Sequence, residues 1–499
     1  MPVLIFESRF FAFFLVFKKD TEFLVAFFAE PCYIEEQRGL RGRDSNMRII
    51  IVGDGKVGST FAQRLSKAGH DVTIIDKRAT ALQHTMESLD IMAIEGNGTT
   101  LEIQREAGVE QADLLIAATN TDEQNLLTCL IAKRAGAKHT IARVRSPEYV
   151  KEISLIQEDL GLSLTINPEL ACATEMARVL RFPSAVKIDT FTGGRVEILK
   201  HCLSPNSPLA GIRLSELSRF KASVLICAVE RGKEVFIPNG SFQLAAGDRI
   251  SIVAQPRDAS LFFRRIGAPT SPVRQIMLLG GGRIAYYLAA QMADFGADVK
   301  IIEQDYAVCR NLAEALPNVT IIHGDGTDHQ LLSQEGIEEM DAVATLTGLD
   351  EQNILMSLYA GQVSRAKIIT KITRDSFEDI VENMDVGSVF YPRYIAAEAV
   401  VRYVRAMANS TGSNVETLYS IVGDKAEALE FRVSQGSRVC GIPLQDLRTR
   451  PGILIGSIHR GARVFIPRGQ DTIEVGDSVV VVTTLPNLND LDDILDRRR

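Results

Sequence analysis

The chain has 499 residues, 46% of them hydrophobic and 24% charged, a composition typical of soluble globular proteins. This length exceeds what one hydrophobic core can organise, so several domains are expected. The formal net charge of −8 argues against nucleic acid as a partner, because nucleic-acid-binding proteins favour a basic face.

Residues 1–29 are rich in Phe, Leu and Val, but charged side chains interrupt every apolar stretch. No window reaches the roughly 18 uninterrupted apolar residues that a membrane-spanning helix needs. Met47 stands directly before the first clear strand pattern. We therefore interpret residues 1–46 as a non-native or disordered extension, with a membrane-surface anchor as the alternative.

The rest of the chain is a tandem duplication. Residues 48–58 (RIIIVGDGKVG) and 275–285 (QIMLLGGGRIA) both run from apolar residues into a glycine turn. GNGT at 96–99 recurs as GDGT at 324–327, and TNTDEQN recurs as TGLDEQN. The matched positions stay close to 228 residues apart throughout, so the two halves are related over nearly their whole length.

Each half contains two kinds of domain. Strand patterns alternate with helical patterns in the first part, which predicts right-handed βαβ units and a parallel sheet. In the first half these strands are expected at 48–52, 72–76, 91–94, 113–118 and 140–144. The second part carries hairpin patterns such as VLICAVERGKEVFIPNG, which predict a small α+β domain.

The expected fold class is therefore α/β, a Rossmann-like, doubly wound parallel-sheet domain followed by a small α+β domain, twice. The Rossmann-like domains are expected at 47–165 and 274–390, and the α+β domains at 186–266 and 413–497.

Three glycines and an acidic residue in the first half form a dinucleotide-binding fingerprint. Gly53 permits a tight turn, Gly55 lets backbone N–H groups approach a phosphate, and Gly58 lets the following helix pack against the sheet. Asp76 ends the second strand, where it would bind ribose hydroxyls and repel a 2′-phosphate. The pattern favours NAD or an adenine nucleotide over NADP. A βαβ unit that has lost its ligand is the alternative.

The second half has Gly280, Gly282 and Ala285 in the same places, with Glu303 as the acidic residue. Alanine at the third position is tolerated because that residue only needs to be small. Arg283 either neutralises phosphate charge or is simply solvated.

Further candidates follow the fourth strand of each half. Ligands of open parallel sheets lie at the carboxyl ends of the strands. Thr119 and Asn120 are expected at this edge in the first half, and Thr347 and Gly348 in the second.

Arg143 and Lys371 occupy matched positions at the end of the fifth strands. Each is expected either to pair with phosphate or to be a surface cation. The acidic runs at 122–125 and 350–353 are interpreted as helix starts, because acidic residues complement the helix dipole there.

Catalytic and metal-binding patterns are lacking. The sequence has no GxSxG, HExxH or Walker A motif, no matched His–carboxylate arrangement, and seven scattered cysteines without metal-ligand spacing. No separate substrate domain follows either Rossmann unit. We expect a protein that is not an enzyme. The alternative, an NAD-dependent dehydrogenase, would need a catalytic Lys, His or Tyr facing the nicotinamide.

This organisation, with GDGKVG, Asp76, GNGT, TNTDEQN and IARVRSPEY, resembles the TrkA family of regulators of potassium uptake in bacteria and archaea. The resemblance covers about residues 47–497 and implies RCK N-terminal and RCK C-terminal domains, each present twice. It implies a cytoplasmic homo-oligomeric ring, peripheral on the inner face of the membrane. NAD or NADH, or else ATP or ADP, would gate a membrane-embedded, Trk-type potassium-translocating subunit. The regulatory subunit of a different cation transporter is the alternative.

The resemblance also assigns two sets of nucleotide-binding residues. The first site would comprise Gly53, Asp54, Gly55, Lys56, Val57, Asp76, Thr119, Asn120 and Arg143. The second would comprise Gly280, Gly281, Gly282, Arg283, Ile284, Glu303, Thr347, Gly348 and Lys371. Because Gly348 lacks the side chain that Asn120 provides, the first site is expected to be the stronger.

Overall fold

The computed structural model describes residues 46–181, 187–191, 196–232, 234–268, 273–382, 384–409, 415–422, 425–461, 463–485, 488 and 490–496. The interpretation of residues 1–46 as an extension falls almost wholly on residues 1–45, which lie outside the described residues. Among the helices in the described ranges, none combines the length and apolar character needed to cross a bilayer.

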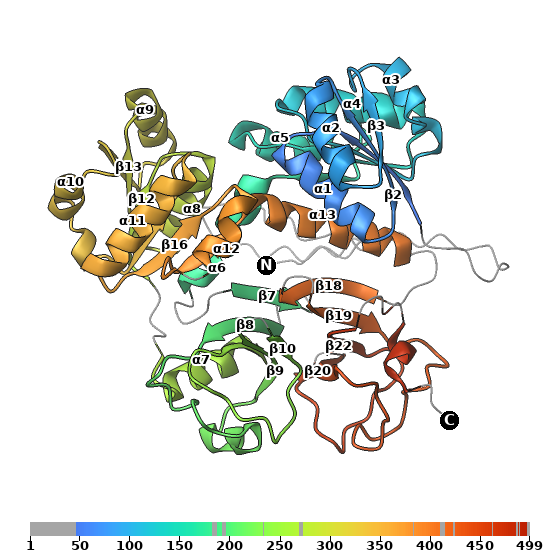
Figure 1. Cartoon of the computed structure of the whole chain (residues 1–499), viewed down its shortest axis with the longest axis vertical. Helices are drawn as coiled ribbons and strands as arrows, with labels where there is room; N and C mark the ends of the chain where they lie inside the picture. Colours follow the sequence, from blue (N-terminus) through green and yellow to red (C-terminus); the bar gives the residue numbers. More distant parts are fainter. Residues whose placement is uncertain are drawn as a thin grey trace, which may run out of the picture. The chain divides into compact units, whose positions relative to one another are not determined.

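The first parallel sheet has six strands in the order β3-β2-β1-β4-β5-β6. These are β1 (Arg48–Val52), β2 (Asp71–Asp76), β3 (Met92–Glu95), β4 (Leu114–Ala117), β5 (His139–Arg143) and β6 (Leu164–Ile166). The connecting helices are α1 (Lys56–Lys67), α2 (Ala79–Ser88), α3 (Leu101–Glu106), α4 (Asp122–Ala135) and α5 (Pro147–Ile156). Figure 1 shows strands β2 and β3 among the helices that connect the sheet. The predicted βαβ alternation is confirmed, and β6 is a strand that the pattern did not predict. The order reverses between β1 and β4, which is where doubly wound sheets bind ligands.

The second parallel sheet repeats this order as β14-β13-β12-β15-β16-β17. Its strands are β12 (Gln275–Leu279), β13 (Asp298–Glu303), β14 (Thr320–His323), β15 (Ala342–Thr345), β16 (Lys367–Lys371) and β17 (Ser388–Phe390). Its helices are α8 (Arg283–Asp294), α9 (Tyr306–Ala315), α10 (His329–Gln334), α11 (Asp350–Val363) and α12 (Glu378–Val381). Gln275 pairs with Asp298 as Arg48 pairs with Asp71, so the duplication extends to strand register.

Each half also contains a five-stranded antiparallel sheet, in the orders β10-β9-β11-β8-β7 and β18-β19-β22-β20-β21. The first comprises β7 (Lys187–Phe191), β8 (Val196–Cys202), β9 (Val224–Arg231), β10 (Glu234–Phe236) and β11 (Arg249–Ala254), followed by α7 (Pro256–Arg265). The second comprises β18 (Val415–Val422), β19 (Ala426–Arg432), β20 (Ile453–Arg460), β21 (Arg463–Phe465) and β22 (Ser478–Thr483). The hairpins predicted at the Arg-Gly turns are confirmed as β9–β10 and β20–β21.

In both antiparallel sheets, the aspartate of the Gly-Asp turn binds an arginine at the end of the hairpin. Arg231 donates from Nε and Nη2 to the two oxygens of buried Asp248, each at 2.8 Å. Arg460 binds Asp477 in the same bidentate manner, at 2.8 and 2.7 Å. These fork-like pairs hold the turn before the last strand against the hairpin.

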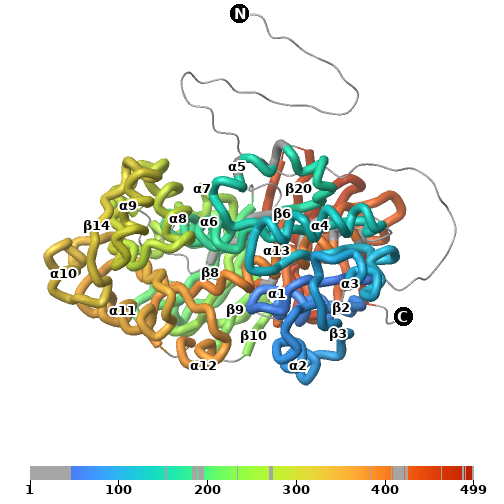
Figure 2. Tube along the Cα trace, turned by 90° about the horizontal axis from the view of Figure 1, so that it is seen from above, coloured from blue at the N-terminus to red at the C-terminus, as the bar shows by residue number. Residues whose placement is uncertain are grey.

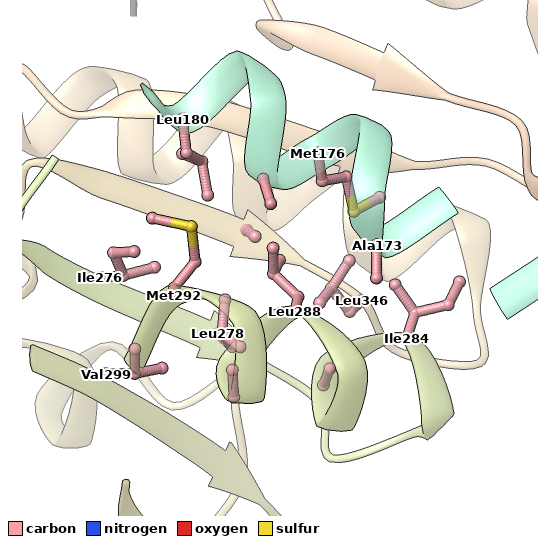
Figure 3. Packing of buried hydrophobic residues seen from close by; sticks show 14 of the residues in the cluster. Ala173, Met176, Leu180, Ile276, Leu278, Ile284, Leu288, Met292, Val299 and Leu346 are labelled. Carbon is pink, nitrogen blue, oxygen red and sulfur yellow. The ribbon is translucent and has the colours of Figure 1, made fainter. Parts of the chain in front are cut away.

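Two long helices cross between the halves. Helix α6 (Pro168–Arg181) follows the first parallel sheet but packs on α8 of the second domain (Figure 3). Its residues Met176 and Leu180 are fully buried in one apolar cluster with Ile276 and Leu288. Helix α13 (Pro392–Asn409) likewise follows the second sheet and lies along α1 of the first domain (Figure 2).

The exchange is therefore reciprocal. Ala396, Val400 and Val404 of α13 are buried together with Ile49 and Phe61 of the first domain. Each Rossmann-like core is completed by a helix from the opposite half. The two domains are thereby joined by apolar burial, the dominant favourable term in folding.

This exchange predicts where a core substitution acts. Met176→Ala should cost about 2–5 kcal/mol of unfolding free energy, as buried Met-to-Ala changes do. The added hydrogen exchange should appear in residues 276–301 of the second domain, although Met176 belongs to the first half. Leu127→Ala, at a side chain that is 49% exposed, is the control and should leave exchange unchanged. If hydrogen exchange became faster only in residues 48–166, the packing of α6 into the second domain would be contradicted.

Candidate nucleotide-binding sites

The glycine loop between β1 and α1 depends on two close approaches. Gly53 has φ +105°, and a Cβ there would lie 2.9 Å from the carbonyl carbon of Ala118. A Cβ on Gly58 would lie 1.8 Å from the carbonyl oxygen of Gly53. Gly53 thus permits the tight turn that was predicted. For Gly58 the nearest obstacle is the carbonyl directly after β1, and Cγ2 of Ile51 on β1 is the next residue at 3.7 Å, in line with close packing of α1 on this strand.

The middle glycine of each loop faces open space. A Cβ on Gly55 or on Gly282 would meet nothing within 4 Å. Both residues are the N-caps of helices, α1 and α8, and neither helix has a side-chain cap at that end. The first N–H groups of these helices thus have no side-chain acceptor at the cap, and such a helix N-terminus is a site that favours an anion.

The acidic residues fix these loops to the neighbouring strand. Asp76 accepts from the backbone N–H of Asp54 at 2.7 Å and from that of Arg78 at 2.9 Å. Burial alone would raise the pKa of Asp76, but the hydrogen bonds from Arg78 and from the loop backbone outweigh it and lower the pKa. Glu303 makes the same pair of bonds, to the N–H groups of Gly281 at 2.6 Å and Asp305 at 2.8 Å. The longer side chain thus makes the same loop contacts as Asp76.

The two loops differ in the residue between the first two glycines. In the first loop Asp54 is buried, and its two carboxylate oxygens accept from the Thr85 hydroxyl at 3.0 and 2.8 Å. In the second loop Gly281 stands there, and a Cβ on it would lie 2.7 Å from Cδ1 of Leu312. Leu312 is the repeat counterpart of Thr85. A buried polar pair in one half is thus replaced in the other by one apolar side chain that fills the space.

The residue two positions after each acidic residue also differs. Arg78 is 61% exposed and extends over Asp76, with Nε 3.1 Å from the carboxylate. Asp305 at the matched position instead caps α9 by accepting from the N–H groups of Ala307 and Val308. The carboxylate at the end of β2 therefore has a guanidinium beside it, whereas the matched position after β13 carries an acidic residue.

An asparagine that the sequence analysis did not select organises the carboxyl edge of each sheet. Asn125 is fully buried and accepts from the backbone N–H and the hydroxyl of Thr119, both at 2.7 Å. Its Nδ2 donates to the carbonyl of Arg143 at 2.8 Å. Asn353 makes the corresponding bonds to Thr347 and Lys371.

The asparagines therefore tie the ends of the fourth and fifth strands together. Their recurrence at matched places in the two halves was a signal that could have identified them. The acidic runs that contain them do begin helices α4 and α11, as predicted.

The surface-cation alternative for Arg143 and Lys371 is wrong. Arg143 is 13% exposed, and its Nη2 lies 3.4 Å from Glu169 on α6. Lys371 donates to the carbonyl oxygens of Leu346, at 3.1 Å, and Thr347. Burial lowers the pKa of both cations, partly offset by the charges of Glu169 and Asp350. The partners of both cations, Glu169 for Arg143 and the carbonyls of Leu346 and Thr347 for Lys371, lie more than 20 residues away in sequence, which local spacing does not reveal.

The remaining candidates lie at the same edges. Lys56 and Val57 begin α1, and Arg283 and Ile284 begin α8. The carbonyl of Asn120 accepts from the guanidinium of Arg145, and a Cβ on Gly348 would meet nothing within 4 Å. Each set of candidates is thus gathered around the ends of adjacent strands of one sheet.

The domain families that match the chain cover both halves. The TrkA-N domain matches residues 49–168 and 276–392, and the TrkA-C domain matches residues 203–267 and 428–496. The chain belongs to the TrkA family. The resemblance inferred from the motifs is confirmed, as are the fold class and its tandem repeat.

Named relatives agree with this membership. The "Trk system potassium uptake protein TrkA homolog 1" of Methanosarcina mazei is 36% identical over 87% of this chain and 97% of its own length. The homolog of Archaeoglobus fulgidus is 35% identical over 90% of this chain and all of its own. These names describe potassium uptake proteins rather than enzymes, in line with the expectation of a non-enzymatic protein.

A solved structure shares the fold. The structure described as "GsuK channel bound to NAD" superposes with a TM-score of 0.58 and 18% identity, over 89% of this chain and 78% of that one. Similarity at this level of identity establishes the architecture.

The glycine loop predicts a contrast between two conservative substitutions. Gly58→Ala should lower the unfolding free energy by about 1–3 kcal/mol, as overpacking against backbone does. Gly55→Ala places its methyl group in open space at an ordinary backbone conformation and should change stability by less than about 0.5 kcal/mol. Urea unfolding of the two variants measures this, and equal losses would contradict the loop geometry.

The buried Asp54 predicts a pH dependence. Burial raises the pKa of this carboxyl, an effect that the Thr85 hydrogen bond only partly offsets. The folded chain therefore holds this proton more tightly than the unfolded chain, and stability falls as pH rises through the raised pKa. Asp54→Asn keeps an acceptor for Thr85 but has no carboxyl to ionise, so the variant does not lose stability as the pH rises. The unfolding free energy of the variant minus that of the unmodified protein should therefore be larger at pH 7.5 than at pH 4. A difference independent of pH in urea unfolding would show that the carboxyl has an ordinary pKa.

Proposed function

We propose that this TrkA-family protein is a nucleotide-sensing regulatory subunit of a potassium uptake system. It binds NAD or NADH, or else ATP or ADP, at both glycine loops. Nucleotide occupancy changes the state of a homo-oligomeric ring, which docks on the cytoplasmic face of a membrane-embedded Trk-type subunit and gates potassium flow. The observation that carries the proposal is the doubled site. Both halves keep an open middle glycine at a helix N-terminus, beside a carboxylate that is fixed at the end of the next strand.

The residues of each site suit a dinucleotide. The N–H groups at the starts of α1 and α8 would bind the pyrophosphate, with Lys56 and Arg283 adding positive charge. Glu303 would accept hydrogen bonds from the adenosine ribose, since each of its oxygens accepts one backbone bond and can accept another. Asp76 would do the same in place of its bonds to the exposed guanidinium of Arg78. Thr119 with Asn120, and Thr347 with Gly348, would line the opposite side. Arg143 and Lys371 would act behind them, supporting the strand ends.

The relatives and the fold support the ligand and the partner. Proteins at 35–36% identity carry the name Trk system potassium uptake protein. A channel of the same architecture is described as bound to NAD. Regulation of this kind requires only that the nucleotide bind one conformation of the ring more tightly than another.

Nucleotide binding is tested by thermal shift with NAD, NADH, ATP and ADP. Binding to the folded state should add about 2.7 kcal/mol of stability at a ligand concentration 100 times the dissociation constant. Asp76→Ala and Glu303→Ala should each remove the part of this ligand-induced stabilisation that comes from one site. Asp71→Ala and Asp298→Ala, at the opposite ends of the same strands, are matched controls and should keep both parts. No shift with any of the four nucleotides would overturn the proposal.

The role in transport is tested in the host cell. Loss of this protein should slow growth at limiting potassium, and the unmodified gene should restore it. The double variant Asp76→Ala, Glu303→Ala should fail to restore growth at equal protein level, while Asp71→Ala, Asp298→Ala should succeed. Full restoration by the double site variant would separate potassium uptake from nucleotide binding.

A further inference from the structure

The hydroxyl of Tyr287 on α8 joins the second Rossmann-like domain to the first through two hydrogen bonds. The hydroxyl of Tyr287 donates to the backbone carbonyl of Arg145 at 2.9 Å. Asn167 supports the contact by donating from Nδ2 to the same hydroxyl at 3.0 Å. Tyr287 is 7% exposed, so the bond is shielded from competing water.

Each end of this contact adjoins a proposed nucleotide site. Tyr287 lies in the second turn of α8, which begins directly after Gly282. The position of Tyr287 is therefore coupled to the glycine loop of the second site. Arg145 follows β5 of the first domain, where its backbone N–H donates to Asp122 at 2.8 Å. Its guanidinium also donates to the carbonyl of Asn120, a candidate residue of the first site.

The repeat does not supply the reciprocal contact. Thr60 is the counterpart of Tyr287, and its hydroxyl donates to the carbonyl of Lys56 within its own helix at 2.7 Å. Thr373 is the counterpart of Arg145, and its hydroxyl is bound to Asp350 of its own domain. The link is therefore a feature of one domain face only and does not follow from the duplication.

We propose that Tyr287 is a positioning residue that couples the two nucleotide sites, so that occupancy of the second site tightens binding at the first. A nucleotide on the loop before α8 orders the first turns of that helix. Tyr287 then holds the backbone of Arg145, and Arg145 holds the edge at Asn120. The first site accordingly has less conformational freedom to lose when its own nucleotide binds, which gives positive cooperativity. This inference rests on the proposed function.

The test uses the full chain, with NAD as the probe. The dissociation constant of the first site is measured by calorimetry with the second site intact and with it disabled by Glu303→Ala. Disabling the second site should weaken the first by about fivefold or more, the lower end of ordinary allosteric couplings. Tyr287→Phe should abolish that difference. Tyr286→Phe is the matched control, because it removes a hydroxyl from the same helix and leaves the bond to Arg145 intact.

A second measurement needs no ligand. Tyr287→Phe should speed hydrogen exchange of the backbone around 119–122 and 145–146 in the nucleotide-free protein, and Tyr286→Phe should not. The Arg143–Glu169 pair and the α6–α8 core remain in both variants, so the fold is expected to persist.

The outcomes separate the two proposals. NAD binding at both sites with independent constants, binding at one site only, or a coupling that survives Tyr287→Phe overturns the role of Tyr287 and leaves nucleotide sensing standing. The absence of NAD binding at either site overturns both. Unchanged exchange in Tyr287→Phe would also contradict the positioning role.

Discussion

The reciprocal burial of α6 and α13 is the constraint on which the rest of this structure depends. Each helix leaves the domain that precedes it and completes the apolar core of the other. Separating the Rossmann-like domains would therefore expose the apolar faces of two helices and leave two cores incomplete. Asn167, directly before α6, contacts Tyr287 of the second domain, so a contact between the two halves accompanies the exchange.

The duplication preserves backbone geometry more strictly than side-chain chemistry. Strand order, register, the glycine loops and the buried Asn125 and Asn353 are common to both halves. The space beneath the loop is filled by Asp54 with Thr85 in one half and by Leu312 in the other. The backbone conformation of the glycine loop is thus the same in both halves, while the charged side chains around it differ. Under the proposed function, two loops of one design but different electrostatic character would suit a regulator that responds to more than one nucleotide state.

Sequence reasoning identified the features that local patterns determine. The strands from β1 to β5, the glycine loops and the carboxylates at the ends of β2 and β13 follow from periodicity and spacing within one βαβ unit. The burial of Arg143 was not predicted, because Glu169 reaches it from a helix whose amphipathic pattern does not specify its partner. The role of Asn125 was missed for a related reason, since a helix-start motif explains its neighbours but not a side chain that bridges two strand ends.

The central claim is that both halves of the chain bind nucleotide. Equilibrium dialysis with radiolabelled NAD and adenine nucleotides tests it most directly by counting the nucleotides held per chain at saturation. The account predicts two per chain for the unmodified protein and one for either Asp76→Ala or Glu303→Ala. Saturation at one nucleotide per chain that neither substitution changes, or no retained nucleotide at all, would contradict it.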